Sequence, residues 1–303
     1  MDRRDFLKRL SGGILLATLP CHYSCKIPTR SLRFGIVTDI HYADREPWGT
    51  RFYKGSIAKL QHAIDLFNKE DLDFIIELGD LKDQNIPGNK EETIGFLKKI
   101  ESVIKSYKGP SYHVLGNHDM DCISKEDFLQ YTSNPGNADK KTYYSFDVRN
   151  IRFIVLDANF NEDGTPYDSG NFDWTQAYLP KEQLEWLSLE LKKDDKYVVV
   201  FIHQLLDSFS DIYESVCVKN ANEVIALLES RKNVLAVFQG HHHEGHYSFR
   251  KNIHYCTIKG MIEGELPDNN SFAIVEIHPN YDISISGFYS YACKEMKHFQ
   301  FGE

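Results

Sequence analysis

The strongest constraint on the fold of this chain is a series of five short clusters of metal-binding side chains, each placed after an apolar run. The clusters lie within the first 243 of 303 residues and supply carboxylate, amide and imidazole groups but no thiolate. Their seven members are Asp39, His41, Asp80, Asn117, His203, His241 and His243. Core packing does not explain polar residues after five separate apolar runs, so a shared site is the better interpretation.

The apolar runs are short and bounded by glycine or polar residues, which is typical of buried β-strands. They span residues 32–37, 73–78, 112–115, 197–202 and 234–238. Because ligands in α/β sheets bind at the carboxyl ends of the strands, we expect the five clusters to meet at one edge.

Helical patterns alternate with these strands, which predicts an α/β fold. The expected helices cover residues 56–68, 92–107, 182–191 and 221–230, with Ser56 as the first N-cap, and further strands follow at 253–258, 271–277 and 283–291. At 42% hydrophobic residues the chain can bury a large core, and no repeat or linker divides it. We expect a single domain over residues 31–303, built from two packed mixed β-sheets with helices outside.

The ligand set fits two adjacent divalent cations if one carboxylate bridges them. Such a pair clamps the attacking and leaving oxygens of a phosphate ester or anhydride, and it lowers the pKa of a bridging water so that hydroxide forms near neutral pH. Two divalent cations against Asp39, Asp80 and one hydroxide leave about one net positive charge. The site can therefore attract phosphate although the chain carries a formal net charge of −9.

The order of the clusters resembles the calcineurin-like metallophosphoesterase superfamily. The motifs that carry the resemblance are Asp39-x-His41, Gly79-Asp80, Gly116-Asn117-His118-Asp119, the lone His203 and Gly240-His241-x-His243. The resemblance covers about residues 33–277 and implies a four-layer sandwich. It also implies that Asp39, His41, Asp80 and His243 hold one metal, and that Asp80, Asn117, His203 and His241 hold the other, with Asp80 bridging.

His118 is the candidate for a catalytic residue that is not a ligand. It follows Asn117, so it can donate a proton to the leaving oxygen or stabilise the departing charge, a role that the resemblance also implies. Asp119 is expected to orient His118 through a carboxylate–imidazole hydrogen bond. The alternative is that His118 only braces a turn. His242 is expected to point away from the metals, and His246 is either a contact near the site or structural.

Further residues narrow the resemblance to the manganese-dependent ADP-ribose/CDP-alcohol diphosphatases, which cleave the pyrophosphate of nucleoside-diphosphate-linked small molecules. These residues are 39–44, 51–53, 112–119, 143–146, 182–187, 253–255 and 259–263. The metals implied are two divalent ions, Mn, Fe or Zn, and their identity stays open because Asp, Asn and His ligands suit several metals. Some relatives carry Gln where this chain has His41, a difference that bears on metal preference. A phosphomonoesterase with the same site and a noncatalytic metal-binding scaffold are the alternatives. The complete ligand set and His118 argue against the scaffold.

Two segments are candidates for recognising a small phosphorylated, nucleotide-derived substrate. Arg51 precedes the helix predicted from Ser56, so a guanidinium and a helix N-terminus could both face a second phosphate. The alternative is an exposed arginine without this role. Residues 159–178 form a long loop containing Tyr167, Phe172, Trp174 and Tyr178, whose rings either stack on a base or sugar or pack over the outer sheet.

The N-terminus resembles a twin-arginine export signal. Arg3 and Arg4 precede Phe-Leu-Lys at 6–8 and an apolar stretch at 12–19, which is too short for an ordinary transmembrane helix. Asp2 and the absence of an Ala-x-Ala site depart from the pattern. We expect residues 1–30 to direct export to the periplasm or cell envelope, with a cytoplasmic enzyme as the alternative.

The remaining composition limits the partners. Cys21 follows Pro20, an unfavourable lipidation site, so membrane contact is expected only if the chain is lipid-anchored. The six cysteines show neither a disulfide framework nor zinc-site spacing. Residues 1–20 carry four basic and two acidic side chains, so their removal would change the net charge from −9 to −11. This acidity argues against nucleic acid as the main partner.

Overall fold

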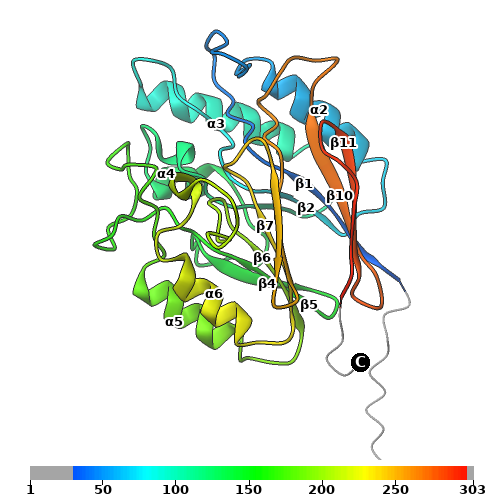
Figure 1. The fold of residues 1–303 in the computed structure, drawn as a ribbon. Helices are drawn as coiled ribbons and strands as arrows, with labels where there is room; N and C mark the ends of the chain where they lie inside the picture. The colour runs from blue at the N-terminus through cyan, green and yellow to red at the C-terminus, as the bar shows by residue number, and fades with distance from the viewer. Residues whose placement is uncertain (1–29, 299–303) are drawn as a thin grey trace, which may run out of the picture.

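The computed structural model describes residues 30–298, which form two six-stranded β-sheets packed face to face with helices on both outer faces (Figure 1). The predicted export signal, including Arg3 and Arg4, lies outside the described residues. Across the first sheet the strands are β12 (Lys294–Met296), β11 (Ile283–Tyr289), β10 (Ser271–Ile277), β1 (Leu32–Val37), β2 (Phe74–Glu77) and β3 (Ser111–His113). Across the second they are β4 (Tyr144–Val148), β5 (Ile151–Val155), β6 (Tyr197–Phe201), β7 (Val234–Gln239), β9 (Ile253–Thr257) and β8 (His246–Arg250).

Each sheet contains a block of parallel strands, which aligns the carboxyl ends of those strands. In the first sheet β1, β2 and β3 are parallel, while β10, β11 and β12 extend it by antiparallel pairing. In the second sheet β5, β6, β7 and β9 are parallel, and β4 and β8 pair antiparallel at the two edges. Parallel strands are connected by crossovers, which here are mostly the helices that cover the sheets.

The helices bury one apolar face each against a sheet. α2 (Ser56–Phe67) and α3 (Lys90–Ile104) cover the first sheet, where Leu60 and Leu97 share a buried cluster with Ile75 of β2. α5 (Lys181–Glu190) and α6 (Ala221–Glu229) cover the second, and Figure 1 shows these pairs on opposite sides of the molecule. The connections also contain α4 (Lys125–Tyr131) and short 3₁₀ turns at His118–Met120 and Glu214–Val216.

Aromatic rings fill the space between the two sheets. Phe34 of β1 stacks on Phe74 of β2 with ring centroids 4.9 Å apart, and it meets Phe153 and Phe201 of the second sheet edge-on at 5.8 and 5.7 Å. Full burial of each such ring stabilises the fold by about 1.5–3 kcal/mol. This core fixes how the two sheets face each other, and so it fixes the relative positions of their strand ends.

The predicted architecture of two mixed sheets flanked by helices is confirmed, while several elements differ in detail. The helix expected from residue 92 begins at Lys90, because the Asn89 side chain caps it, and the N-cap of α2 is Gly55 rather than Ser56. Strands β4, β5, β8 and β12 were not predicted from the sequence. In β8 the side chains are half-buried or exposed and mostly polar, which hides a strand pattern. Within residues 30–298, no helix has the length and apolar character needed to cross a membrane.

Candidate dinuclear metal site

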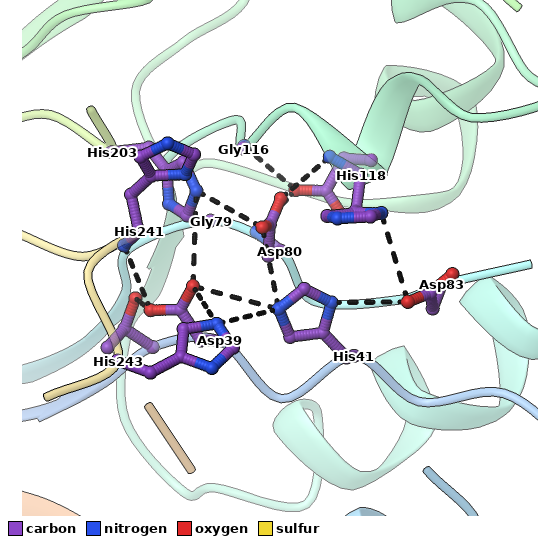
Figure 2. Close-up of polar contacts among 12 residues, drawn as sticks. Asp39, His41, Gly79, Asp80, Asp83, Gly116, His118, His203, His241 and His243 are labelled. Atoms are coloured by element: carbon purple, nitrogen blue, oxygen red, sulfur yellow. Dashed lines mark hydrogen bonds and ion pairs between the residues drawn. The ribbon is translucent and has the colours of Figure 1, made fainter. Parts of the chain in front are cut away.

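All five predicted clusters follow strands whose carboxyl ends meet at one place in the structure. Asp39 and His41 follow β1, Asp80 follows β2 and Asn117 follows β3, while His203 and His241 follow β6 and β7 of the other sheet. The side chains of six ligand candidates form two groups of three, one on each side of the site (Figure 2). The stacking of the two sheets therefore brings together residues that are up to 204 positions apart.

The first group consists of Asp39, His41 and His243. Nε2 of His243 lies 3.3 Å from Oδ1 of Asp39 and 3.2 Å from Nε2 of His41. Nε2 of His41 lies 3.7 Å from the same Asp39 oxygen. Three donor atoms so close together suit one cation bound by nitrogen and oxygen ligands.

The second group consists of Asp80, His203 and His241. Nε2 of His203 lies 3.2 Å from Oδ2 of Asp80, and this oxygen is also 3.5 Å from Nε2 of His41 in the first group. Asp80 thus lies between the groups, as a bridging carboxylate must (Figure 2). A bridging ligand keeps two cations near the separation of about 3.5–4 Å that two-metal hydrolysis requires.

Several buried donor atoms of these residues have no hydrogen-bond partner among the described residues. They are Oδ1 of Asp39, Oδ1 of Asn117, Nε2 of His203 and Nε2 of His241. An unsatisfied buried polar atom costs about 1–3 kcal/mol, so four of them in one place need a ligand. Two divalent cations would satisfy them, and the seven predicted residues fit this pair.

Contacts of Nδ1 on the far side of three imidazoles leave Nε2 as the nitrogen that faces the site. Nδ1 of His203 donates to the carbonyl oxygen of Leu78 at 2.8 Å, and Nδ1 of His243 lies 2.6 Å from a carboxylate oxygen of Glu263. Nδ1 of His41 lies 3.3 Å from Asp83. In each ring Nε2 therefore faces the site and is the nitrogen available to a metal.

Glu263 and Asp83 were not identified as site residues from the sequence, although their positions offered some indication. Asp83 follows the ligand Asp80 by three residues, and Glu263 ends one of the segments that resemble the diphosphatases. Metal-binding histidines usually donate their second nitrogen to a carboxylate or carbonyl, so an acidic residue close to a ligand cluster is a candidate partner. The sequence alone does not show which acidic residue meets which ring.

The expected hydrogen bond between Asp119 and His118 is wrong, because Asp121 takes that position. Nδ1 of His118 lies 2.7 Å from a carboxylate oxygen of Asp121, and a 3₁₀ turn places residues three apart on the same side. Asp119 points inward instead, fully buried. Its carboxylate accepts four backbone N–H groups, from Asp80 and Gly116 at 2.9 Å, from Leu81 at 3.0 Å and from Lys82 at 3.3 Å. Asp119 therefore holds the Gly-Asp and Gly-Asn loops against each other.

The backbone at the ligands is strained. Asp39, His41, Asp80 and His241 have φ values of 51°, 48°, 57° and 65°, in the left-handed region that most side chains avoid. Such strain persists only where the surroundings over-determine it, and it is concentrated at functional sites. Gly116 shows how tight the site is, since a Cβ atom there would lie 2.2 Å from the backbone nitrogen of Asp80.

The charges of the site compensate one another before any cation binds. Burial alone would raise the pKa of Asp80, but His203, His118 and His41 outweigh burial and hold this pKa well below its usual range. Burial alone would lower the pKa of His203, but Asp80 and Asp39 raise it to about 10. In His241 burial and the nearby His203 act together and lower the pKa to about 3, so this ring is neutral and ready to coordinate. Metal binding must therefore release a proton from His203.

A cavity of about 1030 Å³ opens directly over the two groups, and its lining includes His118, Arg51 and Trp174. Arg51 lines the cavity, as expected of a residue that faces the substrate. No residue of the first turn of α2 is part of this lining, so the predicted role of the helix N-terminus has no support. In the 159–178 loop, Tyr167 is buried and stacks on Phe172, with ring centroids 4.2 Å apart, so these two rings pack. Trp174 is 45% exposed and faces the cavity instead.

The two remaining histidines differ from each other. His242 lines the cavity but belongs to neither ligand group, whereas Nε2 of His246 lies 3.0 Å from the hydroxyl oxygen of Ser210. His246 also lies 3.6 Å from the buried Asp207, so its contacts serve the packing around β8.

Comparisons with known proteins agree with this geometry. Residues 32–245 match the family model described as calcineurin-like phosphoesterase. A manganese-dependent ADP-ribose/CDP-alcohol diphosphatase from Oryza sativa subsp. japonica is 28% identical, over 86% of this chain and 91% of that protein. A human protein of the same name is 27% identical, over 83% and 88%.

Among solved structures, a dimetal phosphatase from Danio rerio superposes with a TM-score of 0.76 at 20% identity, covering 88% of this chain and 99% of that one. At this identity the match shows a common fold. The family model covers most of the chain, including every predicted ligand. This protein therefore belongs to the calcineurin-like phosphoesterase family and is a metal-dependent phosphoesterase.

Proposed function

We propose that this enzyme hydrolyses the pyrophosphate bond of nucleoside-diphosphate-linked small molecules, such as ADP-ribose or CDP-alcohols, with manganese as the preferred metal. The relatives cited above carry that activity in their names. The observation that carries the proposal is the cavity of about 1030 Å³ over the two ligand groups. Its size suits a nucleotide-sized ligand, since ligand pockets measure about 300–1,000 Å³. A simple phosphomonoester would leave most of it empty.

The chemistry divides between the metals and the chain. Two divalent cations, when bound, supply Lewis acidity and activate a water near neutral pH. The residues of the site would hold the two cations, with Asp80 placed between the two ligand groups. Water adds to one phosphorus, and the bond from that phosphorus to the bridging oxygen breaks. The departing phosphate keeps the electron pair of that bond.

His118 is the proton donor for this departing oxygen in the proposed reaction. Its Nδ1 is engaged by Asp121 at 2.7 Å, so Nε2 is the nitrogen that remains for the cavity that His118 lines. A second carboxylate, Asp83, lies 3.8 Å from the same Nδ1. The two carboxylates stabilise the protonated ring in the orientation that donation requires.

The test is to assay the manganese-loaded protein on bis-nitrophenyl phosphate, nitrophenyl phosphate, ADP-ribose and CDP-choline. We expect turnover of ADP-ribose and CDP-choline, with AMP and CMP among the products. Turnover of the monoester alone would overturn the proposal in favour of a phosphomonoesterase. No turnover with two metals bound would favour the noncatalytic scaffold.

The variant His118→Ala separates catalysis from metal binding in the same assay. We expect it to retain two metals per chain and to lose about 10²–10⁴-fold in turnover, the usual contribution of general acid catalysis. Loss of metal in this variant would make His118 a ligand or a structural residue.

A further inference from the structure

We propose that the enzyme binds its diphosphate substrate in one direction. In this orientation the nucleoside lies against Trp174 and the second phosphate lies at Lys259 and Arg51, so that water attacks the phosphorus that carries the nucleoside. The inference rests on the proposed diphosphatase function. It adds the residues that recognise each half of the substrate, and it names the bond that breaks.

Lys259 is a half-buried lysine in the cavity lining that has no ion-pair partner within residues 30–298. The buried lysines of the described chain, in contrast, have carboxylate or carbonyl partners for their ammonium groups. Lys125, for example, lies 2.5 Å from Asp157, and Lys59 donates to three carbonyl oxygens. A lysine held in a cavity without a carboxylate is suited to an anionic ligand.

The chain at Lys259 packs beside His243 of the first ligand group. The next residue, Gly260, is packed so closely on His243 that a Cβ atom there would lie 2.8 Å from the ring. On the other side, a Cβ atom at Gly245 would lie 2.8 Å from Cγ of Lys259, so the aliphatic stem is confined by that turn. The backbone at Lys259 is therefore held near the His243 end of the metal site, and its side chain lines the cavity.

Arg51 adds a second cation at the same end. Its Nε lies 3.8 Å from Glu263, and residues 51 and 263 also pair through their backbones. Glu263 is engaged more closely by His243, at 2.6 Å, so the guanidinium keeps donors for another anion. Glu244 is a further acidic residue of the lining. Arg51 beside a partly neutralised Glu263, with Lys259 in the same cavity lining, supplies the charge that a second phosphate requires.

The opposite end of the site presents an aromatic ring. The Trp174 indole lies against the His241 ring of the second ligand group, with ring centroids 5.5 Å apart. Its 45% exposure in the cavity leaves apolar surface for a base, and base–aromatic stacking is worth about 1–3 kcal/mol. A phosphorus over the two metals would therefore have the aromatic ring on one side and the cations on the other.

Trp48 provides a matched comparison, because it is also a tryptophan of the cavity lining but lies at the other end. Its backbone pairs with Arg51, and its side chain is 74% exposed. It is therefore on the side of the second phosphate, and most of its side chain is exposed. The proposed direction predicts that Trp174 matters more for the nucleoside than Trp48.

The decisive experiment is hydrolysis of ADP-ribose by the manganese-loaded enzyme in ¹⁸O-labelled water, with both products analysed by mass spectrometry. Attack on the nucleoside phosphorus puts the label in AMP, and the former bridging oxygen leaves with ribose 5-phosphate. Label in ribose 5-phosphate would overturn the direction while leaving the diphosphatase function intact. Absence of hydrolysis would overturn both.

Two variants test the two ends separately. Lys259→Met keeps the stem of the side chain and removes the charge. We expect it to raise KM for ADP-ribose about tenfold, as for the loss of one hydrogen bond to a charged group. KM for the nitrophenyl ester of thymidine 5′-phosphate, which has a single phosphorus, should rise less than about threefold. Lys193→Met, on the exposed Lys193 beyond α5, is the control.

Trp174→Ala should raise KM for both nucleoside substrates about tenfold, since one stacking contact is lost in each. Trp48→Ala should raise the KM values for the same two substrates less. A larger effect of Trp48→Ala, or equal effects of Lys259→Met on both substrates, would overturn the assignment of the two ends.

Discussion

The closeness of Gly116 to Asp80 leads to a sharp prediction for the variant Gly116→Ala. The added Cβ atom would lie 2.2 Å from both the backbone nitrogen and the Oδ1 atom of Asp80. Neither side can easily move away, because one oxygen of Asp119 accepts the N–H groups of both residues, each at 2.9 Å. Ordinary contact begins near 3.4 Å, so the bridging carboxylate must shift by about 1 Å.

A shift of this size has two consequences of different magnitude. Overpacking of this kind costs about 1–3 kcal/mol of folding free energy, which a domain with about 5–15 kcal/mol survives. Metal ligation tolerates only about 0.2 Å, and Asp80 serves both cations, so metal affinity falls at both positions. A misplacement of about 1 Å costs about 10²-fold in rate. We therefore expect a folded protein that has lost metal and at least about a hundredfold in turnover.

The assay compares metal content after dialysis, turnover of bis-nitrophenyl phosphate and thermal unfolding. Gly95→Ala is the matched control, because Gly95 lies inside α3 and no atom lies within 4 Å of the position that its new methyl group would take. In a helix interior this change stabilises by about 0.5–1 kcal/mol, so the control should melt slightly higher with full activity. Two metals per chain and turnover within about threefold of wild type in Gly116→Ala would refute the reasoning.

Three further predictions concern other parts of the chain. Lys59→Met removes the donor that bonds the carbonyl oxygens of Met261, Glu263 and Gly264, so Glu263 should orient His243 less well. Metal affinity in equilibrium dialysis should fall about 10–100-fold, and unchanged affinity would contradict this role. Burial alone would lower the pKa of His113, but Glu101 and Glu77 raise it to about 10, above its unfolded value of about 6.5. The stabilisation by protonated His113 is complete below about pH 6.5 and is lost as pH rises through about 10. The free energy of unfolding, measured with urea between about pH 7 and 10, should therefore fall more steeply with pH in wild type than in His113→Asn. Equal slopes would exclude the effect. We also propose that residues 1–30 direct export, so a fused reporter should reach the periplasm and replacing Arg3 and Arg4 by Lys should retain it inside; export of both forms would argue against a twin-arginine signal.

Much of the site could be predicted because its residues are placed by local rules. An apolar run that ends in a polar cluster is both a strand and a strand end, and the parallel strands of an α/β sheet share one ligand-binding edge. Asp39, Asp80 and His203 could therefore be placed in one site without knowledge of the fold. The elements that escaped prediction were those whose pattern depends on partners. Arg152 is buried within β5, for example, and interrupts its apolar run because it pairs with Asp147 and Asp194.

The sequence by itself determined the α/β architecture and the chemical type of the site. The number and order of the oxygen and nitrogen donors, each after its own strand, decided these points. Only the tertiary structure decided which group completes each contact. Asp121 rather than Asp119 meets His118, because a 3₁₀ turn aligns residues three apart. Glu263 meets His243, and Lys259 lines the cavity, because the segment after β9 returns to the site. Such pairings depend on how two sheets stack and where loops return, and these long-range distances are not written in any local pattern.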